Sequence, residues 1–154
     1  IDQIAFAIFL YALFKLIATL LVGPLIDKIG IVIPLMLLTF FIGLATVCIG
    51  LKGPVFIALI YYSLYGIGIG ASASTMNYLW ALLYGSAYIA QIKGVIAIIR
   101  NGGTAISPIL FSYFIYGANI RFEQLFIYAG AFIMLMSLIP LVMRYLDTRL
   151  VEEA

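Results

Sequence analysis

Residues 4–26 read IAFAIFLYALFKLIATLLVGPLI, an apolar run with one charged side chain, Lys15, near its centre. A run of this length can cross the hydrocarbon core of a bilayer as a helix. A lysine at the centre of such a helix costs roughly 2.5–3.5 kcal/mol on insertion scales, and no acidic residue lies nearby in the sequence to neutralise it. An anionic substrate in a hydrated cavity would offset that cost. Arg100, inside a later apolar run, poses the same question.

The composition is that of a membrane protein. Of the 154 residues, 66% are hydrophobic and only 9% are charged, which is unlike a soluble globular domain. The net charge of +2 is too small to favour nucleic acid as a partner. The chain has no histidine and one cysteine, Cys48, so neither a disulfide framework nor a cysteine metal site is expected. We expect no cofactor.

We predict an all-α membrane protein in which residues 1–154 form a single transmembrane domain. The expected spans are residues 4–26, 31–51, 54–77, 91–116 and 122–143. The first is expected to end in the charged turn 23–30, and a longer connection over residues 84–94 is expected to precede the fourth. The linkers are short and leave no room for a soluble catalytic domain.

The basic residues predict the orientation in the membrane. With five spans, four of them fall on one side and two, Lys52 and Arg121, on the other; the four are Lys28, Lys93, Arg144 and Arg149. The side richer in basic residues is expected to be cytoplasmic. This puts the N-terminus outside, which favours a fragment that lacks earlier helices. We expect a multi-pass protein of the plasma (inner) membrane, surrounded by lipid bilayer.

Three of the spans carry polar stripes. In the first, Tyr11, Lys15 and Thr19 are four residues apart and share one helical face. The fourth has a comparable face; its residues are Arg100, Thr104 and Ser107, with Asn101 beside them. In the third span, Tyr65 belongs to a looser polar side with Tyr61, Ser72 and Thr75. The second and fifth spans are almost purely apolar and suit lipid-facing positions. This pattern predicts a bundle that encloses a hydrated cavity on one side.

Small residues and helix breakers are concentrated in the third and fourth spans. Gly66, Gly70 and Ser74 are spaced by four, a pattern that permits close contact between membrane helices. Such a stripe needs no role beyond packing. In the fourth span, the pair at residues 102–103 and Pro108 are expected to loosen the helix.

The turn at residues 23–30, GPLIDKIG, resembles the cytoplasmic-loop motif of the major facilitator superfamily, Gly-x-Leu-x-Asp-Arg/Lys-x-Gly-Arg/Lys. The last basic position differs, because Ile31 stands there. The positions that match are Gly23, Leu25, Asp27, Lys28 and Gly30. The resemblance implies that the five spans are helices eight to twelve, most of the C-terminal six-helix half of a twelve-helix transporter. The N-terminal half would then be a missing partner.

The resemblance also implies roles for particular residues. Gly23, Asp27, Lys28 and Gly30 would belong to a conformational gate on the cytoplasmic side; from the residues alone, Asp27 could equally cap the following helix. Cations on the eighth and eleventh helices are similar to those of the oxalate/formate and monocarboxylate branch.

These observations predict a secondary active transporter that moves a small organic anion, a carboxylate, by alternating access. Lys15, supported by Tyr11, Thr19 and Tyr65, would attract the anion. Arg100, with Asn101 and Thr104, would supply a second cation. Anion exchange, as in an antiporter, is favoured over proton coupling through this segment, because no histidine or membrane-buried acid is present to carry a proton.

Other interpretations stay open from sequence alone. Lys15 could neutralise an acid elsewhere in the protein, and the long side chain of Arg100 could reach the interface. The chain could be a major facilitator carrier of a neutral solute, or a non-transporting membrane scaffold subunit. We do not expect an enzyme, because the serines within the spans have no acid or histidine near them in sequence to act as a base.

Overall fold

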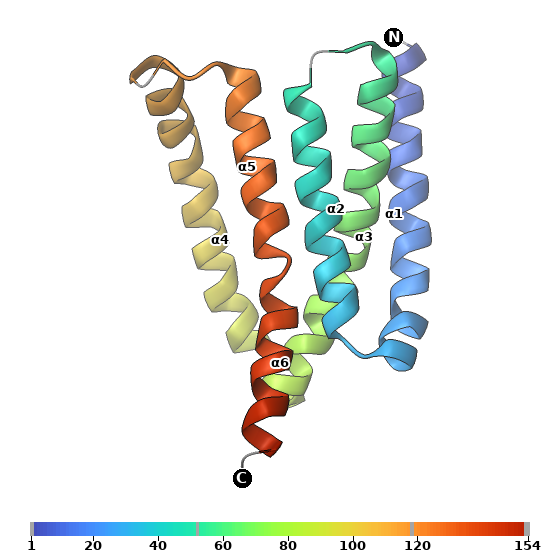
Figure 1. The fold of residues 1–154 in the computed structure, drawn as a ribbon. Helices are drawn as coiled ribbons and strands as arrows, with labels where there is room; N and C mark the ends of the chain where they lie inside the picture. The colour runs from blue at the N-terminus through green and yellow to red at the C-terminus, as the bar shows by residue number, and fades with distance from the viewer. Residues whose placement is uncertain (1, 52, 118, 153–154) are drawn as a thin grey trace.

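The computed structural model describes residues 2–51, 53–117 and 119–152, which form helices joined by short connections (Figure 1). The helices are α1 (Asp2–Ile29), α2 (Val32–Gly50), α3 (Val55–Tyr84), α4 (Ile89–Ser112), α5 (Phe122–Met136) and α6 (Ile139–Glu152). A 3₁₀ turn, η1 (Ser86–Tyr88), precedes α4, and a π-helical turn, η2 (Tyr113–Gly117), follows it. Five segments are long and apolar enough to cross a membrane: Gln3–Ile29, Val32–Gly50, Val55–Tyr84, Ile89–Gly117 and Phe122–Tyr145. The predicted all-α membrane protein with five spans is confirmed.

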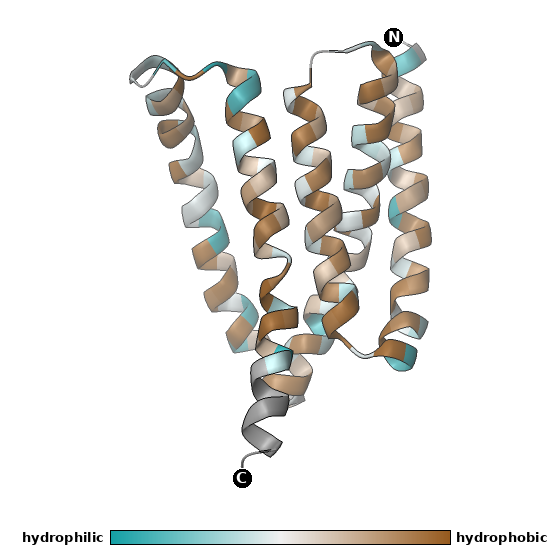
Figure 2. Cartoon of the chain, viewed as in Figure 1, coloured by the Kyte–Doolittle hydropathy of each residue, from teal (hydrophilic) through white to brown (hydrophobic). Residues whose placement is uncertain are grey.

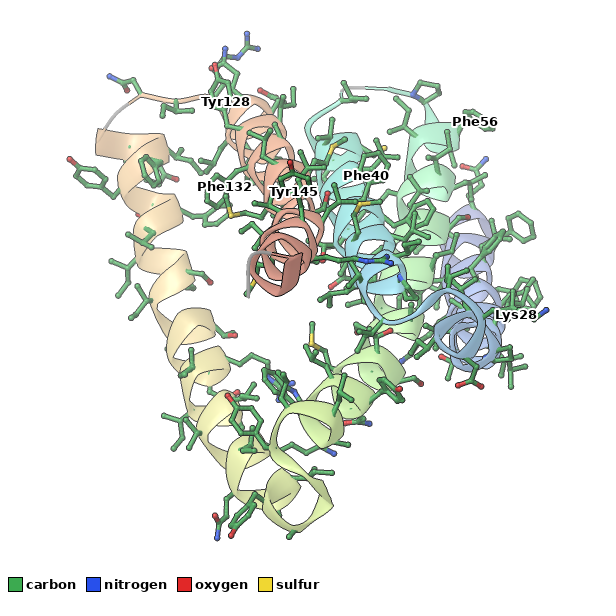
Figure 3. All side chains as sticks on the ribbon, turned by 60° about the horizontal axis from the view of Figure 1, so that its bottom comes forward. Lys28, Phe40, Phe56, Tyr128, Phe132 and Tyr145 are labelled. Atoms are coloured by element: carbon green, nitrogen blue, oxygen red, sulfur yellow. The ribbon has the colours of Figure 1, made fainter. Side chains whose placement is uncertain are left out.

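The helices stand side by side in a curved row. α1 packs along α3, α3 packs on α2, and α2 packs on α5. α4 lies at the far end of the row from α1 and touches α3 only near the connection between them (Figures 1 and 3). Most residues of the helices are hydrophobic, and the strongly hydrophilic ones lie mainly near helix ends, apart from short segments inside α1 and α4 (Figure 2).

Glycines set how closely the central helices approach. A Cβ added at Gly66 would lie 2.6 Å from the carbonyl oxygen of Tyr11 on α1, and one added at Gly68 would lie 3.2 Å from that of Leu38 on α2. Since residues two apart point to nearly opposite sides of a helix, α3 uses its glycines to contact both neighbours. The close contact predicted from the small residues of α3 is therefore confirmed for Gly66 and Gly70, both of which meet α1.

The contact between α2 and α5 follows the same principle. A Cβ at Gly43 would lie 2.9 Å from the carbonyl oxygen of Gly130, and a Cβ at Gly130 would lie 2.7 Å from that of Gly43. Both glycines are buried. α2 lies between α3 and α5 and has the largest buried share of the five spans, so the lipid-facing position predicted for the second span can apply to only part of its surface. Its lack of polar groups suits a position between other helices as well as it suits lipid.

The first helix does not end in the predicted charged turn. α1 continues through Gly23 and Pro24 to Ile29, and only Gly30 and Ile31 separate it from α2. Gly30 has φ +76°, and its N–H donates to the carbonyl of Ile26 over 2.9 Å, as expected of a residue that closes a helix. The motif therefore forms the last two turns of α1. Pro24 removes only one backbone hydrogen bond, and the packing of the apolar residues next to it keeps the remaining turns helical.

Gly30 and Gly23 offer a matched test of this geometry. We expect Gly30→Ala to lower the stability of the protein by about 1 kcal/mol, since a side chain is disfavoured at positive φ. Gly23→Ala should not destabilise, because Gly23 is helical and a Cβ there meets nothing within 4 Å. Thermal unfolding in detergent, followed by circular dichroism, measures both. Equal loss of stability in the two variants would contradict this explanation.

The connection between the third and fourth spans is shorter than predicted. α3 extends to Tyr84, and α4 begins at Ile89, so residues 89–94 are helical and not part of a loop.

Ser72 and Thr75 do not interrupt α3, because their hydroxyls donate to main-chain carbonyls of the preceding turn, over 2.8 Å in each case. Gly85, with φ +76°, ends the helix.

α4 is regular where the sequence predicted a loosened helix. It stays α-helical through residues 102–103 and Pro108. Pro108 has no N–H to donate to the carbonyl of Thr104, but the hydroxyl of Ser107 donates to that carbonyl over 3.1 Å. The polar group freed by the proline is thus satisfied, as a membrane interior requires. The π-helical turn begins only at Tyr113.

The fifth span contains a break that the sequence analysis missed. α5 ends at Met136, and α6 begins at Ile139. Pro140 has no N–H to donate to the carbonyl of Met136. Ser137 is buried, and its hydroxyl donates to the carbonyl of Met134 over 2.6 Å. The chain therefore changes helix within the span that was predicted to be continuous over residues 122–143.

Candidate functional site

Lys15 lies at the centre of α1. It is about 20 Å from either end of this helix by helical rise, too far for its ammonium group to leave the hydrocarbon region by extension alone. Its side chain is exposed on the surface of the described chain. A lone cation therefore projects from the helix row at mid-membrane depth.

Two tyrosines accompany the ammonium group. Nζ of Lys15 lies 5.7 Å from the ring centroid of Tyr11, within the range of a cation–π interaction. The ring of Tyr11 stacks on that of Tyr65 from α3, with centroids 6.0 Å apart. The structure thus brings together three of the residues predicted for the anion site, Tyr11, Lys15 and Tyr65, along the contact between α1 and α3.

The backbone of Lys15 is held directly against α3. A Cβ added at Gly70 would lie 2.9 Å from the Cα of Lys15 and would overlap its carbonyl oxygen. Thr19 joins the two helices at the same level. Its hydroxyl lies 2.8 Å from the carbonyl oxygen of Lys15 and 3.0 Å from that of Gly70. The position of Lys15 therefore depends on α3, through Thr19 and through Gly70, which was predicted to serve only packing.

This geometry changes the expected part of Thr19. A threonine hydroxyl has one proton to donate, and here both nearby acceptors are main-chain carbonyls. In this arrangement Thr19 offers an anion no hydrogen bond, whereas the ammonium of Lys15 and the phenol of a tyrosine can donate. Thr19 fits the role of a residue that positions Lys15 better than that of a direct ligand.

Arg100 occupies a comparable depth on α4. Because α4 begins at Ile89, Arg100 lies about 16 Å along the helix by its rise. Its side chain is exposed, as are those of Asn101 and Thr104. The hydroxyl of Thr104 donates to the carbonyl of Arg100 over 2.9 Å. The donors that this face presents are therefore the guanidinium of Arg100 and the amide of Asn101.

The two cations are not brought together in the described residues. Lys15 is on α1 and Arg100 is on α4, at opposite ends of the helix row (Figures 1 and 3). Among the described residues, the three polar helices do not by themselves enclose one cavity, and the predicted cavity stays a prediction. The reason is that α1 packs mainly along α3, while α4 packs along no helix and has no buried residues, which leaves the polar faces of both uncovered.

Tyr61 and Tyr62 were not predicted as site residues, yet they extend the aromatic cluster. The ring of Tyr61 stacks on that of Tyr65 with centroids 5.6 Å apart, and it meets that of Tyr62 edge-on at 5.0 Å. The signal was the spacing of four between Tyr61 and Tyr65, which puts both on one face of α3. A continuous series of rings leads from Tyr61 to Tyr11 and Lys15.

The residues of the cytoplasmic-loop motif lie together at the C-terminal end of α1. Asp27 and Lys28 are both exposed in its last turn, and Figure 3 shows Lys28 directed away from the bundle. The helix that follows has no side-chain hydrogen bond at its N-cap, so Asp27 does not cap α2. The alternative role considered for Asp27 is thereby removed, and its part in a gate stays a prediction.

Arg121 and Glu123, at the start of α5, form an ion pair over 3.6 Å. Among the described residues, no group of three or more histidine, cysteine, aspartate or glutamate side chains could hold a metal ion.

Comparison with known proteins agrees with the helical architecture. The family described as Major Facilitator Superfamily matches residues 1–153. No curated protein and no solved structure matches the chain. Together with its five apolar helices, this match over nearly the whole length identifies an integral, multi-pass membrane protein with a transport domain, and the chain belongs to the Major Facilitator Superfamily.

Proposed function

We propose that this chain is part of a secondary active transporter that moves a small carboxylate across the plasma (inner) membrane by alternating access. The observation that carries the proposal is Lys15, a cation at the centre of a membrane span with no acidic residue between Asp2 and Asp27. Keeping that charge at this depth is costly. A bound anion in a hydrated cavity, reached by lysine and tyrosine donors, would offset the cost.

Arg100 is the second cation of the proposed site. The exposed polar faces of α1 and α4 lie at the two ends of the helix row, so further helices must cover them to form a cavity. We propose that these helices are the N-terminal half of the same transporter and the first helix of this half. An arginine can grip a carboxylate with two parallel hydrogen bonds, while a lysine acts as a point charge. Substrates with one or two carboxylates fit this pair of cations, as in the oxalate/formate and monocarboxylate branch.

Anion exchange is the proposed mode of coupling for this half. No histidine is present, and the acidic residues inside the described spans lie in terminal turns of helices: Asp27 in the last turn of α1, and Glu123 in the first turn of α5 beside Arg121. The proposed gate is the exposed C-terminal end of α1 together with the glycine that follows it; it contains Gly23, Asp27, Lys28 and Gly30. Movement of the two halves against each other would make and break its contacts in each cycle.

Uptake by the complete transporter in proteoliposomes tests the proposal. We expect saturable uptake of a small mono- or dicarboxylate, accelerated when the vesicles are preloaded with the same anion, as exchange requires. The control is the amide of the same acid, which has a similar shape without the charge. Transport of the amide at the rate of the acid, or no carboxylate uptake at all, would favour a carrier of neutral solutes, for which the tyrosine cluster also offers hydrogen bonds.

A non-transporting scaffold subunit is distinguished from a transporter by what surrounds position 15. In a complete transporter freed of its other cysteines, including Cys48→Ala for the one cysteine of these 154 residues, Lys15→Cys should react with a membrane-impermeant thiol reagent if the position faces a hydrated cavity. Added substrate should slow that reaction. Complete protection from the reagent, with or without substrate, is the result expected if partner helices cover this face.

A further inference from the structure

A wholly apolar cavity lies between α1, α2 and α3, away from the two cations. Its volume is about 150 Å³, and it is lined by side chains of all three helices. The lining includes Ala18, Leu21 and Leu25 from α1, Leu38 and Phe41 from α2, and Ala71 from α3.

The cavity exists because α1 and α2 both pack on α3 but contact each other far less. The small side chains of Ala18 and Ala71 leave the space between them unfilled. Its edge is open to the outside of the helix row, since Leu21 and Leu25 line it while remaining 62% and 36% exposed. Both leucines lie within a membrane span, so the surroundings of this opening are the hydrocarbon of the bilayer.

The size and chemistry of the cavity select its occupant. Water is excluded, because a water molecule needs polar partners and an apolar cavity of this size stays dry. A further helix is too wide, at about 10 Å in diameter. An empty space would leave its lining without dispersion contacts. A single hydrocarbon chain is narrow, apolar and present at high concentration at this depth.

The length of the cavity along α1 also agrees with the thickness of one lipid leaflet. Ala18 and Leu25 are seven residues apart, about 10 Å along the helix, which is within the roughly 15 Å of one leaflet of hydrocarbon. Lys28 lies one turn beyond Leu25 and is exposed. Its ammonium is therefore at the level where the phosphate of a headgroup would lie. We propose that the cavity is a phospholipid site that holds one acyl chain, in the leaflet on the side of the α1–α2 connection.

Photolabelling of the complete protein in liposomes tests this site. The probe is a phosphatidylcholine with a diazirine in the middle of one acyl chain, and labelled residues are located by peptide mass spectrometry. We expect Leu21 and Leu25 to be labelled severalfold more than Leu16 and Leu20, which are exposed on the same helix but do not line the cavity. Ala71→Phe, which fills the cavity, should reduce the label on Leu21 and Leu25 to the level of the reference residues.

The matched control is Ala73→Phe, two residues further along α3 at an exposed position outside the cavity lining, which should keep the wild-type pattern. Gel filtration and circular dichroism check folding; if Ala71→Phe does not fold, the smaller Ala18→Leu carries the same expectation. Equal labelling of lining and reference residues in the wild type would overturn the proposal. So would an unchanged pattern in a folded, cavity-filled variant.

Discussion

Replacing Lys15 with glutamine is expected to lower saturable carboxylate uptake by the complete transporter about 10- to 100-fold. The estimate rests on the roughly 1.5–3 kcal/mol that a hydrogen bond to a charged group contributes, with each 1.4 kcal/mol worth about a factor of ten. The same substitution removes a costly charge from the centre of α1, so the folded protein should be no less stable than the wild type. A loss of transport without a loss of stability is the signature of a substrate-binding cation.

Two variants sharpen the interpretation of Lys15→Gln. Lys93→Gln removes a positive charge from an exposed site near the start of α4, so it should leave uptake close to that of the wild type. Lys15→Arg keeps the charge and should retain part of the uptake. Wild-type uptake by Lys15→Gln would exclude Lys15 from the site and leave Arg100 as the candidate cation. A charge required only for folding would instead make Lys15→Gln unstable.

Gly70→Ala is expected to destabilise the protein by about 1–3 kcal/mol, the usual cost of overpacking a filled contact. The added Cβ would meet the Cα and the carbonyl of Lys15, and backbone atoms cannot move aside by changing rotamer. α1 must therefore shift away from α3, which also lengthens the contact of Thr19 with the carbonyl of Gly70. Unfolding in a graded series of denaturing detergent measures the loss of stability.

Gly103→Ala is the matched control for Gly70→Ala. Gly103 lies in the middle of α4, and a Cβ there meets nothing within 4 Å. Because alanine favours helix by up to about 1 kcal/mol over glycine, this variant should be as stable as the wild type or slightly more so. If both substitutions had the same effect on stability, the close approach of α1 and α3 at Gly70 would not be the cause.

The sequence predicted what depends on local chemistry. The five spans follow from the length and composition of the apolar runs, since a membrane helix satisfies its own backbone and needs no partner to be recognised. The depth of Lys15 follows from its place in such a run. The contact of α3 through Gly66 and Gly70 follows from spacing, because residues four apart share a helical face.

Helix ends and irregularities were predicted less well. Pro24 and Pro108 both stop a helix in isolation, yet each lies inside one here. Neighbouring groups decide the outcome: the hydroxyl of Ser107 satisfies the carbonyl that Pro108 leaves free, while Pro140 accompanies a real break after Met136. Which of these results a proline produces depends on the groups around it, which the presence of the proline alone does not specify.

The sequence by itself determined that this is a five-span membrane chain with a cation at mid-depth in two of its helices. Only the tertiary structure decided which helices are neighbours: α1 with α3, α3 with α2, and α2 with α5. In lipid, an apolar helix face gains little by choosing one apolar partner over another, so hydropathy does not specify pairing. Steric fit at a few glycines does, and it brings Tyr65 of α3 against Tyr11, the ring beside Lys15, while Arg100 remains at the far end of the row.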